Sequence, residues 1–186
     1  LLDQEAVCAG YSKSFKYLLD QLDIPNAVIL VQVIENPDEY HVVNMVQMDK
    51  AWYYLDPTFG DIKIEKSYAN YRYAYFGMTS EEMENIYTPQ QEIKKTTAVK
   101  DSFFYHEGAY LKGYDEDQIT AIIASNINNP NPCLAIKCDS RQTYEQVKQL
   151  LRSQHIFNLF ENAGYNPQEF EYYSLDENYC FFLNYW

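Results

Sequence analysis

The spacing of apolar residues changes along the chain, and the first regular pattern begins at Cys8. Apolar side chains recur there with a period of about 3.6 residues, which is typical of one buried face of a helix. The helix is expected to end at Ile24-Pro25, because the residue before a proline avoids the helical region. The residues of this face are Cys8, Tyr11, Phe15, Leu18, Leu19 and Leu22.

Strand-like patterns follow this predicted helix. The first is a run of β-branched and aliphatic residues, and the next two form the arms of a hairpin around Asp49-Lys50. A Tyr-rich stretch after the hairpin is interpreted as strand and connector, and Thr79 begins a short capped helix. The strand segments are 27–33, 40–48, 51–56 and 68–76.

The geometry of the hairpin turn decides whether His41 and Asp56 can meet. If Asp49-Lys50 is a two-residue loop, Met48 faces Ala51, and the two polar residues become diagonal neighbours on one face. A carboxylate can reach an imidazole nitrogen from that position. A four-residue loop keeps this pairing, whereas a three-residue loop places the two residues on opposite faces.

Residues 99–186 show a second set of patterns after the polar, aperiodic segment Thr88–Ala98, which is interpreted as a domain boundary. The predicted domains are therefore 1–88 and 99–186. A β-α-β-α-β-β order predicts a small α+β unit of ferredoxin type. Its elements are a strand from Ser102 to Leu111, a helix that begins at Asp115-Glu116-Asp117 and buries Ile119, Ile122, Ile123 and Ile127, a strand from Cys133 to Cys138, a helix from Arg141 to Ala163 that Gly164 ends, and a hairpin of Phe170–Leu175 and Tyr179–Tyr185.

Cys8 becomes a candidate nucleophile when it is combined with the predicted hairpin. A lone cysteine is more often a small core residue. At the start of a helix, however, the dipole favours the thiolate, which is the form that attacks carbonyl carbon. With His41 as base and Asp56 to orient the imidazole, the three residues match the arrangement of thiol catalysis.

Three motifs in this order resemble the transglutaminase-like superfamily. They are Val7-Cys8-Ala9-Gly10-Tyr11-Ser12, His41 with Asn44, and Trp52-Tyr53-Tyr54-Leu55-Asp56-Pro57-Thr58-Phe59. Bacterial members run roughly G-V-C-x-G-Y-[AS], H-A-W-N-x-V and W-Y-x-V-D-x-T-W, and Tyr75–Met83 resembles the segment that follows. The resemblance covers residues 6–83. Val42-Val43 replace the family's Ala-Trp and Phe59 replaces its second tryptophan, which reshapes the walls of the site and puts substrate preference in doubt.

The resemblance implies a papain/transglutaminase-like core, in which the helix that bears Cys8 packs on an antiparallel sheet. It implies a Cys8-His41-Asp56 triad that acts on amide or peptide bonds of a protein or peptide substrate, with an acyl-enzyme that water or an amine resolves. The backbone N–H of Cys8 would help to bind the oxyanion, and Gln4 is a weak candidate for the upstream donor of the family. No cofactor or metal is expected, and proteins that this chain resembles often lie at the bacterial cell surface or outside the cell.

Two other functions remain open from the sequence. The first is a catalytically inactive transglutaminase-like module that serves binding or structure in a bacterial cell-surface protein. The second is a papain-like protease, in which the histidine and its partner lie much further from the cysteine along the chain.

Composition narrows the classes of partner. The formal net charge is −13, which argues against nucleic acid or an anionic membrane surface as partner. No segment is long enough for a membrane span, so no membrane insertion is expected. The 19 tyrosines either line a cleft or fill half-buried strands, and the second is favoured.

The remaining cysteines and histidines suggest no further chemistry. Cys133 and Cys138 lie five positions apart on one predicted strand and cannot pair with each other, whereas Cys180 could pair with one of them; buried free thiols are favoured. His106, on a predicted strand, and His155, on a predicted helix, are expected to be structural or to face solvent.

Overall fold

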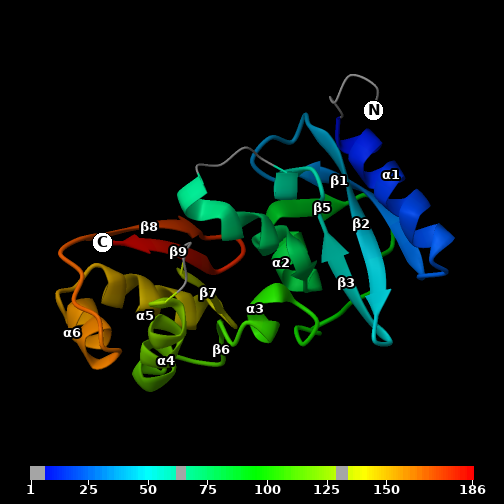
Figure 1. Cartoon of the computed structure of the whole chain (residues 1–186). Helices are drawn as coiled ribbons and strands as arrows, with labels where there is room; N and C mark the ends of the chain where they lie inside the picture. The colour runs from blue at the N-terminus through cyan, green and yellow to red at the C-terminus, as the bar shows by residue number, and fades with distance from the viewer. Residues whose placement is uncertain (1–6, 62–65, 129–133) are drawn as a thin grey trace. The chain divides into compact units, whose positions relative to one another are not determined.

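The computed structural model describes residues 7–61, 66–128 and 134–186. The protein is a mixed α+β molecule, coloured along the chain in Figure 1. Its contacts define two compact units, Leu1–Lys63 with Arg72–Phe103 and Ile64–Tyr71 with Phe104–Trp186. This division differs from the predicted bounds 1–88 and 99–186. The polar segment that suggested the boundary is tied to the first unit, because Ser80 N donates to Thr96 O and Thr96 N donates to Ser80 Oγ.

The first unit contains a five-stranded antiparallel sheet with the order β4-β3-β2-β1-β5. The predicted hairpin is confirmed, with Met48 opposite Ala51 and Asn44 opposite Leu55. Asp49 and Lys50 have φ values of 44° and 70°, which a tight two-residue hairpin turn requires. The strands are β1 (Asn26–Val33), β2 (Tyr40–Met48), β3 (Ala51–Leu55), β4 (Phe76–Met78) and β5 (Tyr87–Pro89).

Helix α1 (Cys8–Gln21) begins at Cys8 as predicted and packs on β1 and β2. Its Leu19 lies in a core cluster with Val46 and Leu55. Two residues of the predicted buried face are in fact exposed, because Leu18 and Leu22 are 59% and 68% accessible to solvent. The sheet covers only a narrow stripe of the helix, and both residues lie beside this stripe.

The Tyr-rich stretch 68–76 was predicted as strand and connector, but most of it is 3-10 helix. The short helix η1 (Phe59–Asp61) and the longer η2 (Lys66–Tyr75) precede strand β4. Tyrosine favours strands in general, and here tertiary packing overrides that preference. Helix α2 (Ser80–Ile86) follows with the predicted cap, in which Thr79 Oγ1 accepts from Glu82 N and Glu82 Oε2 accepts from Thr79 N.

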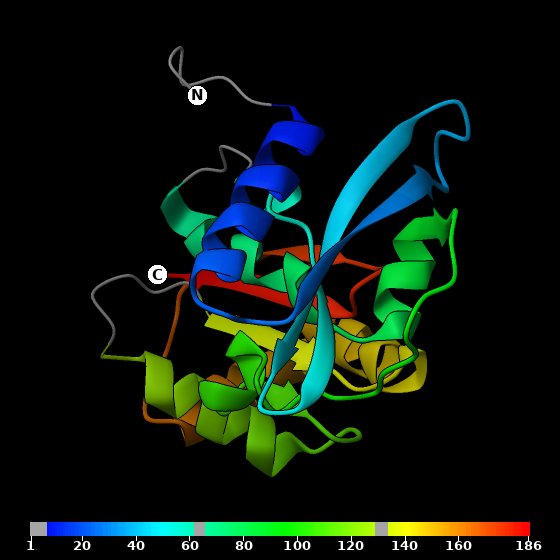
Figure 2. The same cartoon turned by 90° about the vertical axis from the view of Figure 1, so that its right-hand side faces the viewer.

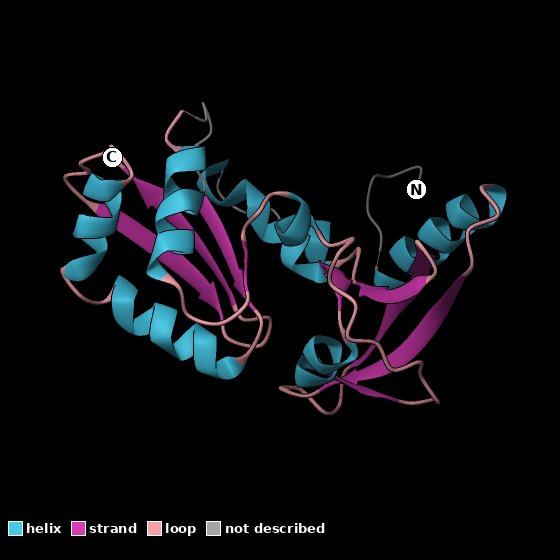
Figure 3. Cartoon of the chain, turned by 90° about the horizontal axis from the view of Figure 1, so that it is seen from below, coloured by secondary structure: helices cyan, strands magenta, loops and turns pink. Residues whose placement is uncertain are grey.

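The second unit has a four-stranded sheet with the order β6-β7-β9-β8, and Figure 3 shows strands and helices in separate colours. In the views of Figures 1 and 2, helices α4, α5 and α6 lie on one side of this sheet. The elements are α3 (Phe103–His106), β6 (Tyr110–Leu111), α4 (Glu116–Asn126), β7 (Leu134–Cys138), α5 (Arg141–Leu151), α6 (His155–Asn162), β8 (Phe170–Leu175) and β9 (Cys180–Tyr185).

The predicted ferredoxin topology is wrong. Strands β6 and β7 are parallel and adjacent, with α4 between them in the chain, and β9 lies between β7 and β8. A split β-α-β unit of ferredoxin type would insert a strand between the two parallel strands. The α+β class holds for this unit, but the specific topology does not.

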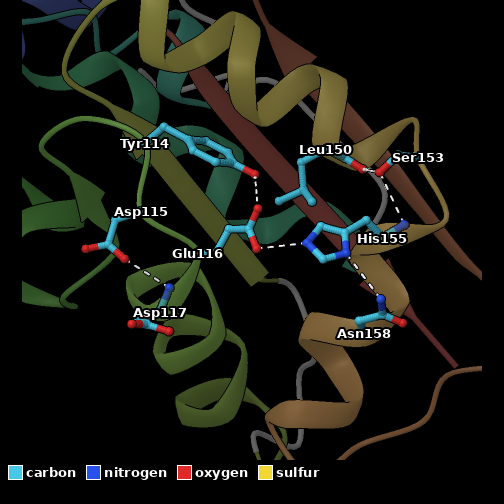
Figure 4. A network of polar contacts seen from close by, with 8 residues as sticks. All are labelled: Tyr114, Asp115, Glu116, Asp117, Leu150, Ser153, His155 and Asn158. Atoms are coloured by element: carbon cyan, nitrogen blue, oxygen red, sulfur yellow. Dashed lines mark hydrogen bonds and ion pairs between the residues drawn. The ribbon is translucent and has the colours of Figure 1, made fainter.

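Two predicted elements of this unit are also corrected. The segment predicted as a strand from Ser102 to Leu111 holds the short helix α3, which carries the exposed His106, and then a turn, and only Tyr110–Leu111 is strand. The helix predicted from Arg141 to Ala163 is two helices, because Ser153 Oγ donates to Leu150 O and accepts from His155 N. These side-chain bonds compete with the helical ladder and end α5. Figure 4 shows this break.

The same figure shows a polar network at the protein surface that joins the start of α4 to the start of α6. His155 Nε2 lies 2.8 Å from Glu116 Oε2, and Tyr114 donates its hydroxyl to Glu116 Oε1. The hydrogen bond with His155 is the main cause that lowers the pKa of Glu116. Both members of the ion pair are more than 40% exposed, with 49% for His155 and 42% for Glu116, so the network holds α4 to α6 without forming a closed site.

Cys8, Cys138 and Cys180 carry thiols and form no disulfide bond. Cys138 and Cys180 are buried, and burial raises the pKa of the Cys138 thiol well above its ordinary value. Register places Lys137 opposite Cys180 across β7 and β9, so Cys138 and Cys180 project from opposite faces. Cys133, which the sequence placed at the start of this strand, lies outside the described residues.

Candidate functional site

His41 and Asp56 lie in contact, as the hairpin register predicted. His41 Nε2 is 2.7 Å from Asp56 Oδ2, and the side chains are 6% and 0% exposed. The other ring nitrogen, Nδ1, has no hydrogen-bond partner among the described residues. The pair is therefore a buried, oriented imidazole with one nitrogen available.

The Asp56 carboxylate is fixed by its neighbours as well as by the histidine. Thr58 N and Phe59 N donate to Oδ1 at 2.9 and 3.0 Å, and the Tyr87 hydroxyl donates to Oδ2. With His41 this makes four contacts on two oxygens. A buried carboxylate with this many partners is held in one orientation.

The end of β3 creates the space for this arrangement. Among the described residues, β3 pairs with β2 only from Asn44 to Met48, so His41 has a strand neighbour on the β1 side alone. After Leu55 the chain leaves the sheet, and Asp56 N donates to Tyr75 O. Asp56 and the following turn thus fill the side of β2 on which His41 has no strand partner.

Aromatic rings cover the imidazole. The centroids of Phe59 and Tyr87 lie 5.2 and 5.5 Å from that of His41, with interplanar angles of 25° and 21°. These contacts keep water from the pair and strengthen its electrostatic interaction. The polar segment around Tyr87 lacks a local sequence signal, so the pattern analysis missed this tyrosine. Its pairing with the sheet through β5 places it at the site.

Cys8 is the first residue of α1 and is partly exposed. The N-cap residue Val7 supplies no side-chain bond, and the N–H groups of Cys8 and Ala9 have no partner among the described residues. Two donors at the positive end of the helix are therefore free to bind an anion. The structure shows no hydrogen bond between the Cys8 thiol and His41. Gln4, the predicted upstream donor, lies outside the described residues.

Two hydrogen bonds fix the first turns of α1 along β2. Ser12 Oγ donates to Val42 O, and Asn44 Nδ2 donates to Ser12 O, both at 3.0 Å. Because the helix and strand run in the same direction here, the turn that carries Cys8 lies level with the start of β2. Side chains alternate along β2, so His41 belongs to the face opposite to Asn44.

The turn after β3 connects the histidine with α1. At its start Asp56 contacts His41, and at its end Asp61 accepts a hydrogen bond from the Tyr11 hydroxyl. That bond is the main cause that raises the pKa of Tyr11. Tyr11 is three residues after Cys8 on the same helix. The segment 56–61 therefore touches both the oriented imidazole and the start of α1.

The comparisons with known proteins add no assignment, because neither a protein-family model nor a curated protein matches the chain. Within the described residues, no three His, Cys, Asp or Glu side chains gather in a way that could hold a metal ion. No helix in the described ranges has both the length and the apolar character needed to cross a bilayer.

Proposed function

We propose that the protein is a thiol enzyme that acts on amide or peptide bonds through Cys8, His41 and Asp56. The observation that carries this proposal is the buried contact between His41 Nε2 and Asp56 Oδ2 at 2.7 Å, which leaves Nδ1 available. Thiol and serine enzymes use a histidine base of this kind, in which a fixed carboxylate binds the ring nitrogen that faces away from the nucleophile.

In the proposed reaction the Cys8 sulfur attacks the carbonyl carbon of an amide, and the thiol proton passes to His41 Nδ1. The imidazolium returns that proton to the leaving nitrogen as the C–N bond breaks, and the acyl group remains on Cys8 as a thioester. Water or a primary amine then attacks the thioester carbon and gives its proton to His41, which returns it to the departing sulfur. The free N–H groups of Cys8 and Ala9 would stabilise the oxyanion in both steps.

The arrangement of the first unit supports a papain/transglutaminase-like core as part of this proposal. A helix with cysteine at its start lies on an antiparallel sheet that carries the histidine on β2, and the aspartate directly follows the neighbouring strand β3. The sequence motifs around these three residues point the same way. The substrate would be a protein or peptide, and a location at the cell surface or outside the cell follows from the same resemblance.

A test of this proposal is the formation of an acyl-enzyme. Incubation with a panel of peptide amides, with and without a primary amine, is followed by intact-mass measurement and mapping of the modified residue. The proposal expects a thioester on Cys8 and its loss in Cys8→Ala, with Cys138→Ala as the matched control because that thiol is buried. Turnover that persists in Cys8→Ala would contradict it.

A non-catalytic binding or structural module is the second candidate. The observations that favour it are the absence of a hydrogen bond from Cys8 to His41 and the position of His41 on the face of β2 opposite to Asn44. In that case the His41–Asp56–Tyr87 cluster only anchors the end of β3. The acyl-enzyme test separates the two candidates, because this module would leave Cys8 unmodified.

A further inference from the structure

A pocket lies beside the candidate site within the first unit, and its volume is about 210 Å³. Its walls come from α1, the end of β3, the turn that follows and the segment that leads into β4. Phe76 is 36% exposed and Asp61 is exposed, so the pocket opens to solvent. Most of the lining is apolar or aromatic, including Phe15, Leu55, Pro57, Tyr73, Tyr75 and Phe76.

The size and lining of the pocket fit one apolar side chain. Pockets for whole small-molecule ligands are larger, roughly 300–1,000 Å³. The lining does include Asp56, but its side chain is buried and already engaged by His41, Tyr87 and two backbone N–H groups. Asp61 and Arg72 also line the pocket, and both are exposed to solvent. Most of the lining is apolar or aromatic, so an aromatic or branched aliphatic group suits this space better than a charged group, whose burial against such a lining costs free energy.

The pocket lies at a fixed distance along α1 from Cys8. Phe15 follows Cys8 by seven residues, which corresponds to about 10 Å along a helix. An extended peptide covers this length with about three residues. Between the two positions, Tyr11 binds Asp61, which also lines the pocket. The backbone of a peptide attacked at Cys8 could thus run along α1 to the pocket.

We propose that this pocket is a substrate subsite that binds an aromatic or branched aliphatic side chain two or three residues from the scissile amide. The inference rests on the proposed function, because it assigns the pocket to the substrate of Cys8. The subsite would give the enzyme a preference for apolar peptides, and Asp56 would couple the occupied pocket to the orientation of His41.

Gly60 offers a direct way to fill the pocket. It lines the space, its φ is not positive, and an added Cβ would meet only Arg72 O, at an ordinary distance of 3.5 Å. Gly60→Leu should occupy the pocket, whereas the matched Gly60→Ala should leave most of it open. Phe76→Ala is a second variant, which removes a partly exposed wall and preserves the core.

The experiment has two readouts. The first is kcat/KM for peptide amides that carry a single phenylalanine at successive distances from the scissile bond, against alanine at the same position. Wild type and Gly60→Ala should favour phenylalanine at the second or third position by about 10- to 100-fold, and Gly60→Leu should lose that preference. The second readout is the binding of N-acetyl-phenylalaninamide to each intact protein. It is monitored through the NMR chemical shifts of the backbone amides of Gly60 and Asp61, or of the residues at these positions in the variants.

The two readouts separate the possible failures. Turnover that does not distinguish phenylalanine from alanine at any position overturns the subsite and leaves the proposed function standing. Absence of shifts at residues 60 and 61 overturns the apolar character of the pocket. NMR shifts in wild type that disappear in Gly60→Leu and weaken in Phe76→Ala support an apolar binding pocket. If no peptide is turned over, the proposed function is contradicted, and the pocket is then not a substrate subsite.

Discussion

Replacement of Asp56 by asparagine tests the orientation of the candidate base. Oδ1 accepts from Thr58 N and Phe59 N, so the amide oxygen must keep that position and the new NH2 group must face His41 and Tyr87. An amide donor opposite Nε2 forces the proton of a neutral imidazole onto Nδ1, where it can no longer accept the thiol proton. The side chain fits the same space, so the fold should remain.

The magnitude follows from the bonds that change. Hydrogen bonds to a charged group contribute about 1.5–3 kcal/mol each. In Asp56→Asn the weaker hydrogen bonds of a neutral amide replace those of the carboxylate, so we expect the free energy of unfolding to fall by about 2–4 kcal/mol. Catalysis should fall by a factor on the order of 10²–10³, because a thiol is a stronger acid than a hydroxyl and depends less on its base. Asp101→Asn is the matched control, since it removes the same charge from a partly exposed carboxylate that also accepts from a tyrosine and lies outside the site and the pocket.

The assay combines urea unfolding with the turnover of the best peptide amide. Asp56→Asn should lower the unfolding midpoint and turnover together, and Asp101→Asn should leave turnover within about threefold of wild type. If Asp56→Asn is folded and turns over substrate at the wild-type rate, the carboxylate does not orient a catalytic base, and the reasoning is refuted.

Two further predictions concern the scaffold. Thr79→Ala removes the cap of α2 and should lower the free energy of unfolding by about 1 kcal/mol in urea denaturation, whereas Thr88→Ala, exposed in β5, should change it little; equal effects would contradict the capping role. Burial is the main cause that raises the pKa of Tyr53 and Tyr54 from 10.0 to about 12, so both stay neutral in the folded protein after the unfolded chain has begun to ionise. The two neutral tyrosines contribute fully to the free energy of unfolding below pH 10, and this contribution is lost as the pH rises to about 12. Tyr53→Phe should therefore reduce the loss of stability between these pH values. An unchanged slope of the free energy of unfolding against pH would contradict this expectation.

Local patterns were enough to predict the elements that carry the candidate site. The helix that starts at Cys8 has a clear period and a proline stop, and the hairpin places His41 beside Asp56 because its turn is only two residues long. The exposed Leu18 and Leu22 were missed, because periodicity marks a face but not how much of it the sheet covers.

Long-range packing decided the features that the sequence could not predict. Tyr87 reaches Asp56 from a segment without periodicity, and only the pairing of β5 with β1 places it there. The adjacent parallel β6 and β7 depend on how α4 crosses between them, and the order of elements alone is compatible with several topologies. The break between α5 and α6 depends on the two bonds of Ser153, which a helical pattern does not reveal.

The alkylation rate of Cys8 by iodoacetamide near pH 6 shows whether this thiol is paired with His41. Thiols that are paired with an imidazole react as thiolates at this pH, whereas an ordinary thiol with a pKa of about 8.5 reacts slowly. The account predicts that Cys8 is labelled first in the native protein and at least about tenfold more slowly in folded His41→Ala. Equal rates in the two proteins, or first labelling at Cys138 or Cys180, would contradict it.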